Sequence, residues 1–202
     1  MIKIYGNNKT RTSRCWWALE ELGLDYEKVE IDSIKGETQS LDYLKLNPAG
    51  KVPTMVDGDL VLFESVAINL YLAQKYKENL WPKDPATQAL ALQWSIWVVA
   101  EVEPYVVTLC VERVFKPEPV RNPAKAEAAE EELKKRIDVL DGHLKKMGGT
   151  LTKDDFNIAD LNVAAVLRGM NLFQMDLSPW PNVKSWFEVA QDRPACKRAM
   201  GL

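Results

Sequence analysis

A lysine, a glutamate and a serine flank a short apolar part of the chain, and their side chains can bind groups of opposite charge. Lys51 precedes this part, and Glu64 and Ser65 follow it. Ser65 stands before apolar residues at helical spacing, which predicts that it is a helix N-cap. The start of a helix carries free N–H groups and the positive end of the helix dipole, so it can hold a carboxylate. Lys51 adds a positive charge, and Glu64 can bind an ammonium group.

The elements that must position these residues are two strands and a helix. Two apolar runs, at residues 52–56 and 60–63, flank Asp57-Gly58-Asp59, a composition typical of a tight hairpin turn. Apolar residues at positions 68, 72 and 76 then repeat with helical spacing. The sequence therefore predicts an antiparallel hairpin followed by a helix.

Shorter patterns upstream predict the rest of a small mixed sheet. Residues 2–5 and 26–31 are predicted strands, whereas residues 14–22 and 38–46 are predicted helices. The predicted order is β-α-β-α-β-β-α, an α/β arrangement with helices on both faces of the sheet.

The chain changes character at residues 77–85, which include two prolines. We predict a linker there, between a domain at residues 1–76 and an all-helical domain at residues 86–202. Pro104 is expected to kink or divide the first long helix of the second domain. Apolar residues at positions 133, 137, 140 and 144 predict an amphipathic helix. Asn157 and Asp160 have the spacing of a capping box, which predicts the start of another helix.

Composition argues against several classes of function. The formal net charge is −3, from 26 basic and 29 acidic residues, so no basic field favours nucleic acid. Three widely spaced cysteines favour a reducing compartment. We find no signal-peptide pattern, and no apolar stretch reaching the roughly 18 residues of a membrane span. The single histidine, His143, argues against a metal site and is expected at the surface. A soluble, cytoplasmic protein without a metal is expected.

The motif Asn-Pro-x-Gly-Lys-Val-Pro at residues 47–53, followed by the hairpin and the Glu-Ser pair, resembles the glutathione-binding half of the cytosolic glutathione transferases. The capping box and residues 181–195 resemble that family too, so the resemblance covers nearly the full length. It implies a thioredoxin-like N-terminal domain followed by an all-helical domain. It further implies a homodimer.

The resemblance also assigns roles to the residues around the hairpin. Lys51 would bind the glycyl carboxylate of glutathione, and Glu64 and Ser65 would hold the γ-glutamyl end. The backbone of Val52 would pair with the cysteinyl part, before a cis peptide bond at Pro53. Gln39 stands where some relatives carry a histidine that faces the glycyl carboxylate.

A transferase of this kind must form a thiolate near neutral pH from a thiol with a reference pKa of about 8.5. Lowering that pKa by two units takes about 2.7 kcal/mol. A hydrogen bond to a charged group, of about 1.5–3 kcal/mol, and a helix N-terminus, of about 0.3–1 kcal/mol, can supply it. One hydroxyl at the start of a helix is therefore enough.

The loop before the first predicted helix offers three such hydroxyls, on Thr10, Thr12 and Ser13. Many bacterial relatives read Tyr-Gly-x-x-Arg-Ser-Arg-x-x-Arg here. Against that pattern Thr10 matches the serine, and Arg11 and Arg14 match arginines that would add positive potential near the thiolate. Thr10 is the first candidate and Ser13 the second, and the sequence leaves the choice between them open.

The electrophile is expected between this loop and the long helix, where the candidate residues are Trp97, Glu101, Tyr105 and Arg168. The resemblance therefore implies a detoxifying enzyme that conjugates glutathione to a small apolar electrophile, such as an aryl halide, an isothiocyanate or an organic peroxide. The physiological electrophile and the dimer geometry stay open.

Two other functions compete with conjugation. The first is a glutathione-dependent thiol oxidoreductase or peroxidase that uses Cys15, although Cys15 falls inside a predicted helix as a packed thiol. The second is a non-catalytic binding or regulatory module. The retained Lys51, Glu64 and Ser65 count against the second, because a module that binds only proteins would not need them.

Overall fold

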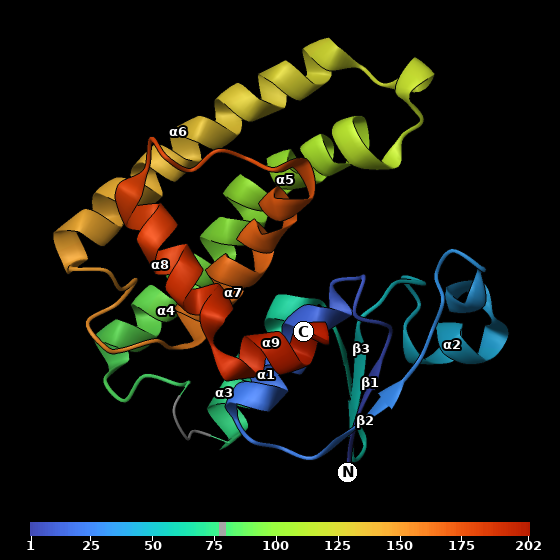
Figure 1. The fold of residues 1–202 in the computed structure, drawn as a ribbon. Coiled ribbons are helices and arrows are strands. Elements are labelled where there is room, and N and C mark those ends of the chain that lie inside the picture. The colour runs from blue at the N-terminus through green and yellow to red at the C-terminus, as the bar shows by residue number, and fades with distance from the viewer. Residues whose placement is uncertain (77–79) are drawn as a thin grey trace. The chain divides into compact units, whose positions relative to one another are not determined.

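The computed structural model describes residues 1–76 and 80–202. Residues 77–79, which belong to the expected linker, lie outside the described residues. The chain divides into two compact units, Met1–Trp81 with Asp192–Leu202, and Pro82–Gln191. Figure 1 shows the course of the chain through both units.

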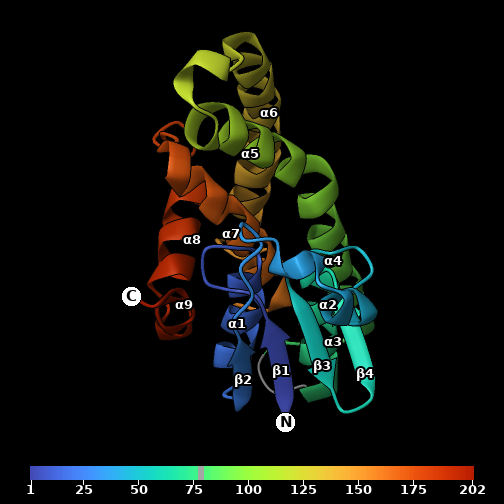
Figure 2. The ribbon, with the colours of Figure 1, turned by 90° about the vertical axis from the view of Figure 1, so that its right-hand side faces the viewer.

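A four-stranded sheet forms the centre of the first unit. Its strands lie in the order β2-β1-β3-β4, with β1 parallel to β2 and β3 antiparallel to both β1 and β4. The hairpin turns between Asp57 and Leu60, as the Asp-Gly-Asp composition predicts. Figure 2 shows the four strands side by side, with β4 at one edge of the sheet. The bounds are β1 (Ile2–Tyr5), β2 (Tyr26–Val29), β3 (Thr54–Asp57) and β4 (Leu60–Phe63).

Helices cover this sheet in the predicted order, which confirms the thioredoxin-like arrangement. They are α1 (Thr12–Glu21), a 3-10 turn (Glu37–Gln39), α2 (Leu41–Leu46) and α3 (Ser65–Tyr76). A further helix of this unit, α9 (Pro194–Met200), packs against α1. Apolar residues of both layers form the core, and Ile4, Leu19, Met55, Ile68 and Leu72 are completely buried.

The helix predicted at residues 38–46 is interrupted. Ser40 has an extended backbone, at φ −64° and ψ 145°, so the 3-10 turn ends there and α2 begins afresh. The Ser40 side chain accepts a hydrogen bond from the backbone N–H of Tyr43 at 3.3 Å. Ser40 is therefore the N-cap of α2, and its hydrogen bond satisfies one of the free N–H groups of the first turn. An extended N-cap residue explains why the helix is interrupted at Ser40.

The last residues of the chain pack against α1. Arg193 donates two hydrogen bonds to the carboxylate of Glu21, at 2.6 and 2.7 Å, and Arg198 donates one to Glu20 at 2.7 Å. Residues 192–202 thus belong to the first unit. They had been predicted to belong to the helical domain at 86–202. At the far end of α9, a Cβ on Gly201 would lie 3.7 Å from the side-chain nitrogen of Asn8.

Helices make up the second unit, and its described residues contain no strand, as predicted. The long helices are α4 (Pro85–Trp97), α5 (Glu103–Cys110), α6 (Pro123–Met147), α7 (Ile158–Leu167) and α8 (Pro181–Asp192). Short turns join them, of which Val98–Val102 and Val111–Phe115 are π-helical, and Glu118–Val120 and Arg168–Phe173 are 3-10 helical.

The π-helical turn Val98–Val102 connects α4 to α5, and Val111–Phe115 continues α5, so that Pro85–Phe115 is one helical stretch. By length and composition alone this stretch could cross a membrane, which differs from the expectation that no segment would. Its residues Ala91, Val98, Val102 and Leu109 are fully buried in the described structure. Because α4 packs against α7 and α5 against α6, the stretch is a core element of the helical unit. Pro104 lies in the first turn of α5, where its missing N–H is tolerated.

The predicted capping box opens α7. The Asn157 side chain accepts a hydrogen bond from Ala159 N, and Asp160 accepts one from Asn157 N at 3.1 Å. Asp160 also accepts a 2.9 Å bond from the indole of Trp186. Every residue of α7 is buried, so this cap begins the central helix of the unit.

Candidate functional site

The Thr10 hydroxyl lies at the start of α1, as expected for a thiol-activating group. Thr10 is half-buried, and its Oγ1 donates to the carbonyl of Asn7 at 2.8 Å. The same oxygen accepts from the backbone N–H of Thr12 at 3.3 Å and lies 2.9 Å from Thr12 Oγ1. The hydroxyl is thus held at the helix end, where backbone N–H groups and the dipole favour negative charge.

Ser13 points its hydroxyl elsewhere. Its Oγ donates to the carbonyl of Thr10 at 2.9 Å, within the first turn of α1. The two arginines of this segment differ in exposure, because Arg11 is exposed and Arg14 is half-buried. The structure therefore brings all four predicted residues to one helix start, with the Ser13 proton directed to the backbone.

Cys15 is completely buried, and its sulfur faces the carbonyl of Ser65 at 3.7 Å. Burial raises the pKa of the Cys15 thiol far above its ordinary value, and the opposing effect of Arg14 is smaller. A buried neutral thiol is a poor nucleophile. The thiol-exchange function that relied on Cys15 thus loses support.

Lys51 lies on the loop before β3, with its side chain exposed and without an ion pair among the described residues. Its backbone is held firmly from inside. The Lys51 carbonyl accepts from the hydroxyl of Tyr43 at 2.6 Å and from the side-chain amide of Asn47 at 2.7 Å. Both side chains also reach the buried hydroxyl of Thr54, at 2.8 and 3.1 Å. The sequence did not indicate Tyr43 or Thr54, and Asn47 was noted only as the start of the motif at residues 47–53, without a role of its own.

The peptide bond between Val52 and Pro53 is cis, as the resemblance implied. The backbone N–H and C=O of Val52 form no hydrogen bond within the described parts of the chain. On the neighbouring turn, the side-chain amide of Gln39 donates to the carbonyl of Gly50 at 3.2 Å. A Cβ on Gly50 would lie 2.5 Å from that amide nitrogen, so the close approach of Gln39 requires glycine. Gln39 and Lys51 thus flank the same loop.

Glu64 differs from expectation in its backbone. It has φ +72°, a conformation that residues other than glycine rarely adopt, and its side chain is exposed. Its carbonyl accepts from the N–H of Ile68 at 2.9 Å, so Glu64 occupies the N-cap position. The prediction of Ser65 as N-cap is therefore wrong by one residue, because Ser65 is the first, buried residue of α3. Such strained backbone is concentrated at functional sites.

The four candidates for electrophile contacts have different partners within the helical unit. Arg136 of α6 donates to the carboxylate of Glu101 at 3.5 Å and to the hydroxyl of Tyr105 at 3.3 Å, with its guanidinium 4.8 Å from the Tyr105 ring centre. Trp97 packs edge-to-face against Trp94. The fourth, Arg168, donates to the side chain of Gln191 at 3.3 Å. Glu101 and Tyr105 share Arg136 as a partner.

His143 packs more closely than a surface histidine. Its ring lies 4.5 Å from that of Trp94, and its Nε2 is 2.9 Å from the carbonyl of Leu151. It is half-buried, which corrects the expectation of surface residence. Among the described residues, no group of three or more His, Cys, Asp or Glu side chains could hold a metal ion.

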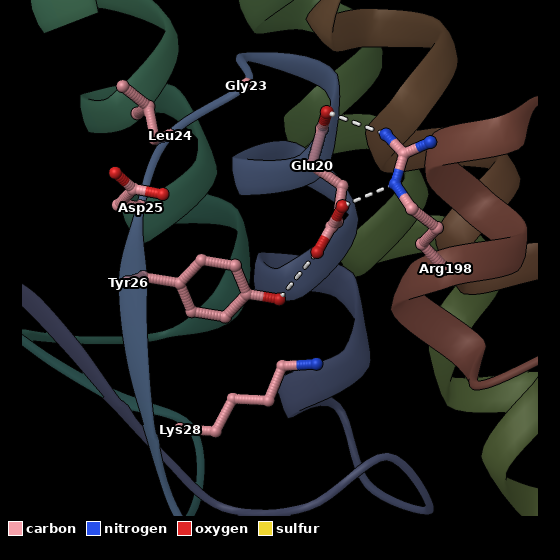
Figure 3. A pocket seen from close by; sticks show the side chains of 7 residues that line it. All are labelled: Glu20, Gly23, Leu24, Asp25, Tyr26, Lys28 and Arg198. Atoms are coloured by element: carbon pink, nitrogen blue, oxygen red, sulfur yellow. Dashed lines mark hydrogen bonds and ion pairs between the residues drawn. The ribbon is translucent and has the colours of Figure 1, made fainter.

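A polar cavity of about 440 Å³ lies in the first unit, beside the end of α1 opposite to Thr10. Figure 3 shows that the carboxylate of Glu20 lies between Tyr26 and Arg198. Tyr26 donates to it at 3.1 Å, and burial followed by this neighbouring charge raises the pKa of Tyr26. The cavity is lined by none of the predicted site residues.

Comparison with known proteins gives matches over both units. The family described as "Glutathione S-transferase, N-terminal domain" matches residues 1–74, and "Glutathione S-transferase, C-terminal domain" matches residues 102–194. Glutathione S-transferase 3 of Zea mays is 35% identical over 98% of this chain and 93% of its own length. Glutathione S-transferase GstB of Escherichia coli is 32% identical over 99% and 98%.

Solved structures agree over the full length. The theta-class glutathione S-transferase from the citrus canker pathogen Xanthomonas axonopodis pv. citri, solved with glutathione bound, superposes with a TM-score of 0.92. It is 28% identical and covers 100% of this chain and 97% of its own. Glutathione transferase F7 from Populus trichocarpa gives a TM-score of 0.90 at 26% identity, covering 100% and 98%.

Proposed function

The chain belongs to the glutathione S-transferase family and takes glutathione as its co-substrate, and we propose that the Thr10 hydroxyl activates the glutathione thiol. The observation that carries this proposal is the position of Thr10 Oγ1, half-exposed at the start of α1 and held there by Asn7 and Thr12. Ser13 is the weaker candidate, because its proton is already directed to a backbone carbonyl.

The proposed mechanism starts with loss of the thiol proton. The proton passes to solvent water, and the thiolate left behind accepts a hydrogen bond from Thr10 Oγ1. Such a charge-assisted bond is worth about 1.5–3 kcal/mol, and the α1 N-terminus adds about 0.3–1 kcal/mol, enough to lower the thiol pKa by one to two units. Arg11 and Arg14 add positive potential. The thiolate then attacks the electrophile and forms the new carbon–sulfur bond, while a halide, for example, leaves with its bonding electrons.

Glutathione would be held at three points of the first unit. The exposed ammonium group of Lys51 binds the glycyl carboxylate, and this binding breaks no ion pair among the described residues. Gln39 flanks the same loop. The unpaired backbone groups of Val52, before Pro53, pair with the cysteinyl part. The exposed carboxylate of Glu64 binds the α-amino group, and the N–H groups at Ser65 face the adjoining carboxylate.

The electrophile, we propose, is small and apolar, and the reaction detoxifies it in the cytoplasm. Glu101 and Tyr105, which share Arg136, and Trp97 are the proposed contacts in the helical unit. We further propose a homodimer. Support comes from the edge strand β4, where Leu60 and Phe63 are 37% and 42% exposed, because apolar side chains on an open sheet edge favour association.

The test is the initial rate of glutathione conjugation to chlorodinitrobenzene and to an aryl isothiocyanate. Thr10→Ala is expected to lower this rate at neutral pH at least about tenfold, the loss of one charge-assisted hydrogen bond. Thr150→Ala is the matched control, since its hydroxyl also donates to a backbone carbonyl, that of Thr152 at 2.6 Å in the helical unit.

The rate should be unchanged in the control. A rate that collapses in Ser13→Ala instead of Thr10→Ala would move the activating role to Ser13. Absence of conjugation to either electrophile by the intact protein, with glutathione still bound, would contradict the proposed function and favour a binding or thiol-exchange protein.

A further inference from the structure

Thr12 offers a second hydroxyl directly behind that of Thr10. The two Oγ1 atoms are 2.9 Å apart, and Thr12 is completely buried. Its hydroxyl also faces the carbonyl of Tyr5, at the longer distance of 3.4 Å. Since no part of Thr12 reaches the surface, its hydroxyl is not available to a ligand and can act only through Thr10.

The Thr12 hydroxyl occupies the space that a side chain on Gly6 would fill. A Cβ on Gly6 would lie 1.9 Å from Thr12 Oγ1, and Gly6 has φ +132°, which residues with side chains rarely adopt. A glycine is therefore required for Thr12 to approach the end of β1. The absence of a side chain at Gly6 thus allows this buried hydroxyl to lie beside Thr10.

The number of protons limits which hydrogen bonds the hydroxyls of Thr10 and Thr12 can form at one time. Each threonine hydroxyl has one proton to donate and two lone pairs to accept. In the structure, Thr10 Oγ1 has Asn7 O at 2.8 Å and Thr12 Oγ1 at 2.9 Å as acceptors, and one proton for both. When that proton points to a thiolate, both acceptors lose it, and Thr10 Oγ1 still has two lone pairs with which to accept.

Thr12 can then fill both of these lone pairs. Its N–H already donates to Thr10 Oγ1 at 3.3 Å, and its hydroxyl can turn from Tyr5 O toward the same oxygen. The carbonyl of Asn7 keeps a bond from Thr10 N at 3.2 Å, so it is not left unpaired. A hydroxyl that accepts hydrogen bonds is a stronger donor, because neighbouring bonds polarise one another.

We propose that Thr12 is a positioning residue, whose buried hydroxyl donates to Thr10 Oγ1 when Thr10 donates to the glutathione thiolate. The inference rests on the proposed role of Thr10. It adds a residue that is not at the surface and that supports the activating hydroxyl from inside the first unit.

The experiment measures the pKa of enzyme-bound glutathione from the ultraviolet absorbance of the thiolate as a function of pH. Thr12→Val keeps the shape and removes the hydroxyl, and Thr12→Ser keeps the hydroxyl. We expect Thr12→Val to lower the bound thiolate fraction, at a pH below the pKa, about threefold, the size of a cooperative contribution to one strong bond. Thr12→Ser should restore the wild-type value.

Two controls separate this effect from loss of stability. Thr152→Val removes an equally buried hydroxyl from the helical unit and should leave the thiol pKa unchanged. In the Thr10→Ala background, Thr12→Val should have no further effect, because the route through Thr10 is gone. If Thr12→Val does not fold, Thr12→Ala, which adds no bulk, takes its place against Thr12→Ser.

The outcomes are distinct. A thiol pKa that is lowered in the wild type and equal in Thr12→Val overturns the inference and leaves the role of Thr10 intact. Equal shifts in Thr12→Val and Thr12→Ser assign the effect to packing and overturn it as well. Glutathione that binds to the wild type with an unperturbed thiol pKa overturns the proposed activation by Thr10 and the role of Thr12 with it.

Discussion

The carbonyl oxygen of Lys51 is held by two buried side chains, those of Tyr43 and of Asn47, the first residue of the Asn-Pro-x-Gly-Lys-Val-Pro motif. Tyr43, in α2, and Asn47, at the C-terminal end of α2, both donate to this oxygen. The hydroxyl of Thr54, in β3, forms hydrogen bonds with both side chains. Because the backbone of Lys51 and Val52 would face glutathione, these side chains set the position of both groups. Their effect should appear in substrate binding more than in chemistry.

Tyr43→Phe is therefore expected to raise the KM for glutathione about fivefold, the value of one net hydrogen bond of about 1 kcal/mol, with kcat nearly unchanged. Tyr71→Phe is the matched control, since the Tyr71 hydroxyl donates to Asp57 at 2.9 Å on another part of the same unit. Steady-state kinetics at varied glutathione concentration measures both. An equal KM in the wild type and Tyr43→Phe would show that the Lys51 loop keeps its position without Tyr43.

Single residues could be predicted where a motif carries them. Lys51, Glu64 and the hydroxyls of residues 10–13 were predicted as site residues from their spacing and their resemblance to a family. The role of Tyr43 was missed, and Asn47 was known only as part of the motif, although the two are four residues apart, the spacing of one helix face, which was an available signal. Thr54 could not be found, because its role depends on how β3 packs against α2.

At the scale of elements, Asp57 connects the hairpin to α3. Its carboxylate accepts from Lys75 at 2.5 Å and from Tyr71 at 2.9 Å. Burial raises the pKa of Asp57, but the hydrogen bonds from Lys75 and Tyr71 outweigh it and hold the pKa below its usual value. A carboxyl whose pKa is lower in the folded state stabilises the fold above its unfolded pKa, and this stabilisation is lost as the pH falls through the folded pKa.

Asp57→Asn is thus expected to lower the free energy of unfolding by about 1–2 kcal/mol at neutral pH, the value of a hydrogen bond to a charged group. The difference from the wild type should shrink as the pH falls from about 4, the unfolded pKa of an aspartate, to lower values. Urea unfolding of both proteins across this pH range measures it. A difference that stays constant with pH would show that the charge of Asp57 does not contribute.

Strands and helices were predicted well where periodicity is strong, and less well at their ends. The four strands follow from short apolar runs bounded by turn residues, and the capping box of α7 follows from the Asn-x-x-Asp spacing. The cap of α3 was misplaced by one residue, because the positive φ of Glu64 has no composition signal. The π-helical turns at Val98–Val102 and Val111–Phe115 lie in apolar sequence, where nothing marks a change of helical pitch.

At the scale of the molecule, the chain returns at its end to its first helix. The Glu21 carboxylate, with 8% of its side chain exposed, accepts two bonds from Arg193 and one from the indole of Trp17 at 2.9 Å. The partners are 172 residues apart in sequence, so no local pattern could have paired them. For this reason residues 192–202 were predicted to belong to the helical domain.

Glu21→Gln is expected to lower the free energy of unfolding by about 2 kcal/mol, because it leaves a partly buried guanidinium without its charged partner. Glu127→Gln, on the exposed face of α6, is the control and should change the stability by less than about 0.5 kcal/mol. Urea unfolding at low and high salt compares the two. Equal stability of both variants would mean that α9 is held by its apolar contacts alone.

The position of Gly201 has a practical consequence for work with this protein. Because Gly201 lies beside Asn8, any polypeptide that continues from the end of α9 starts next to the loop that carries Thr10. Met1, at the outer end of β1, is exposed and lies away from that loop along the strand. An affinity tag or a fusion partner should therefore be attached before Met1, and a carboxy-terminal one is expected to obstruct entry of glutathione.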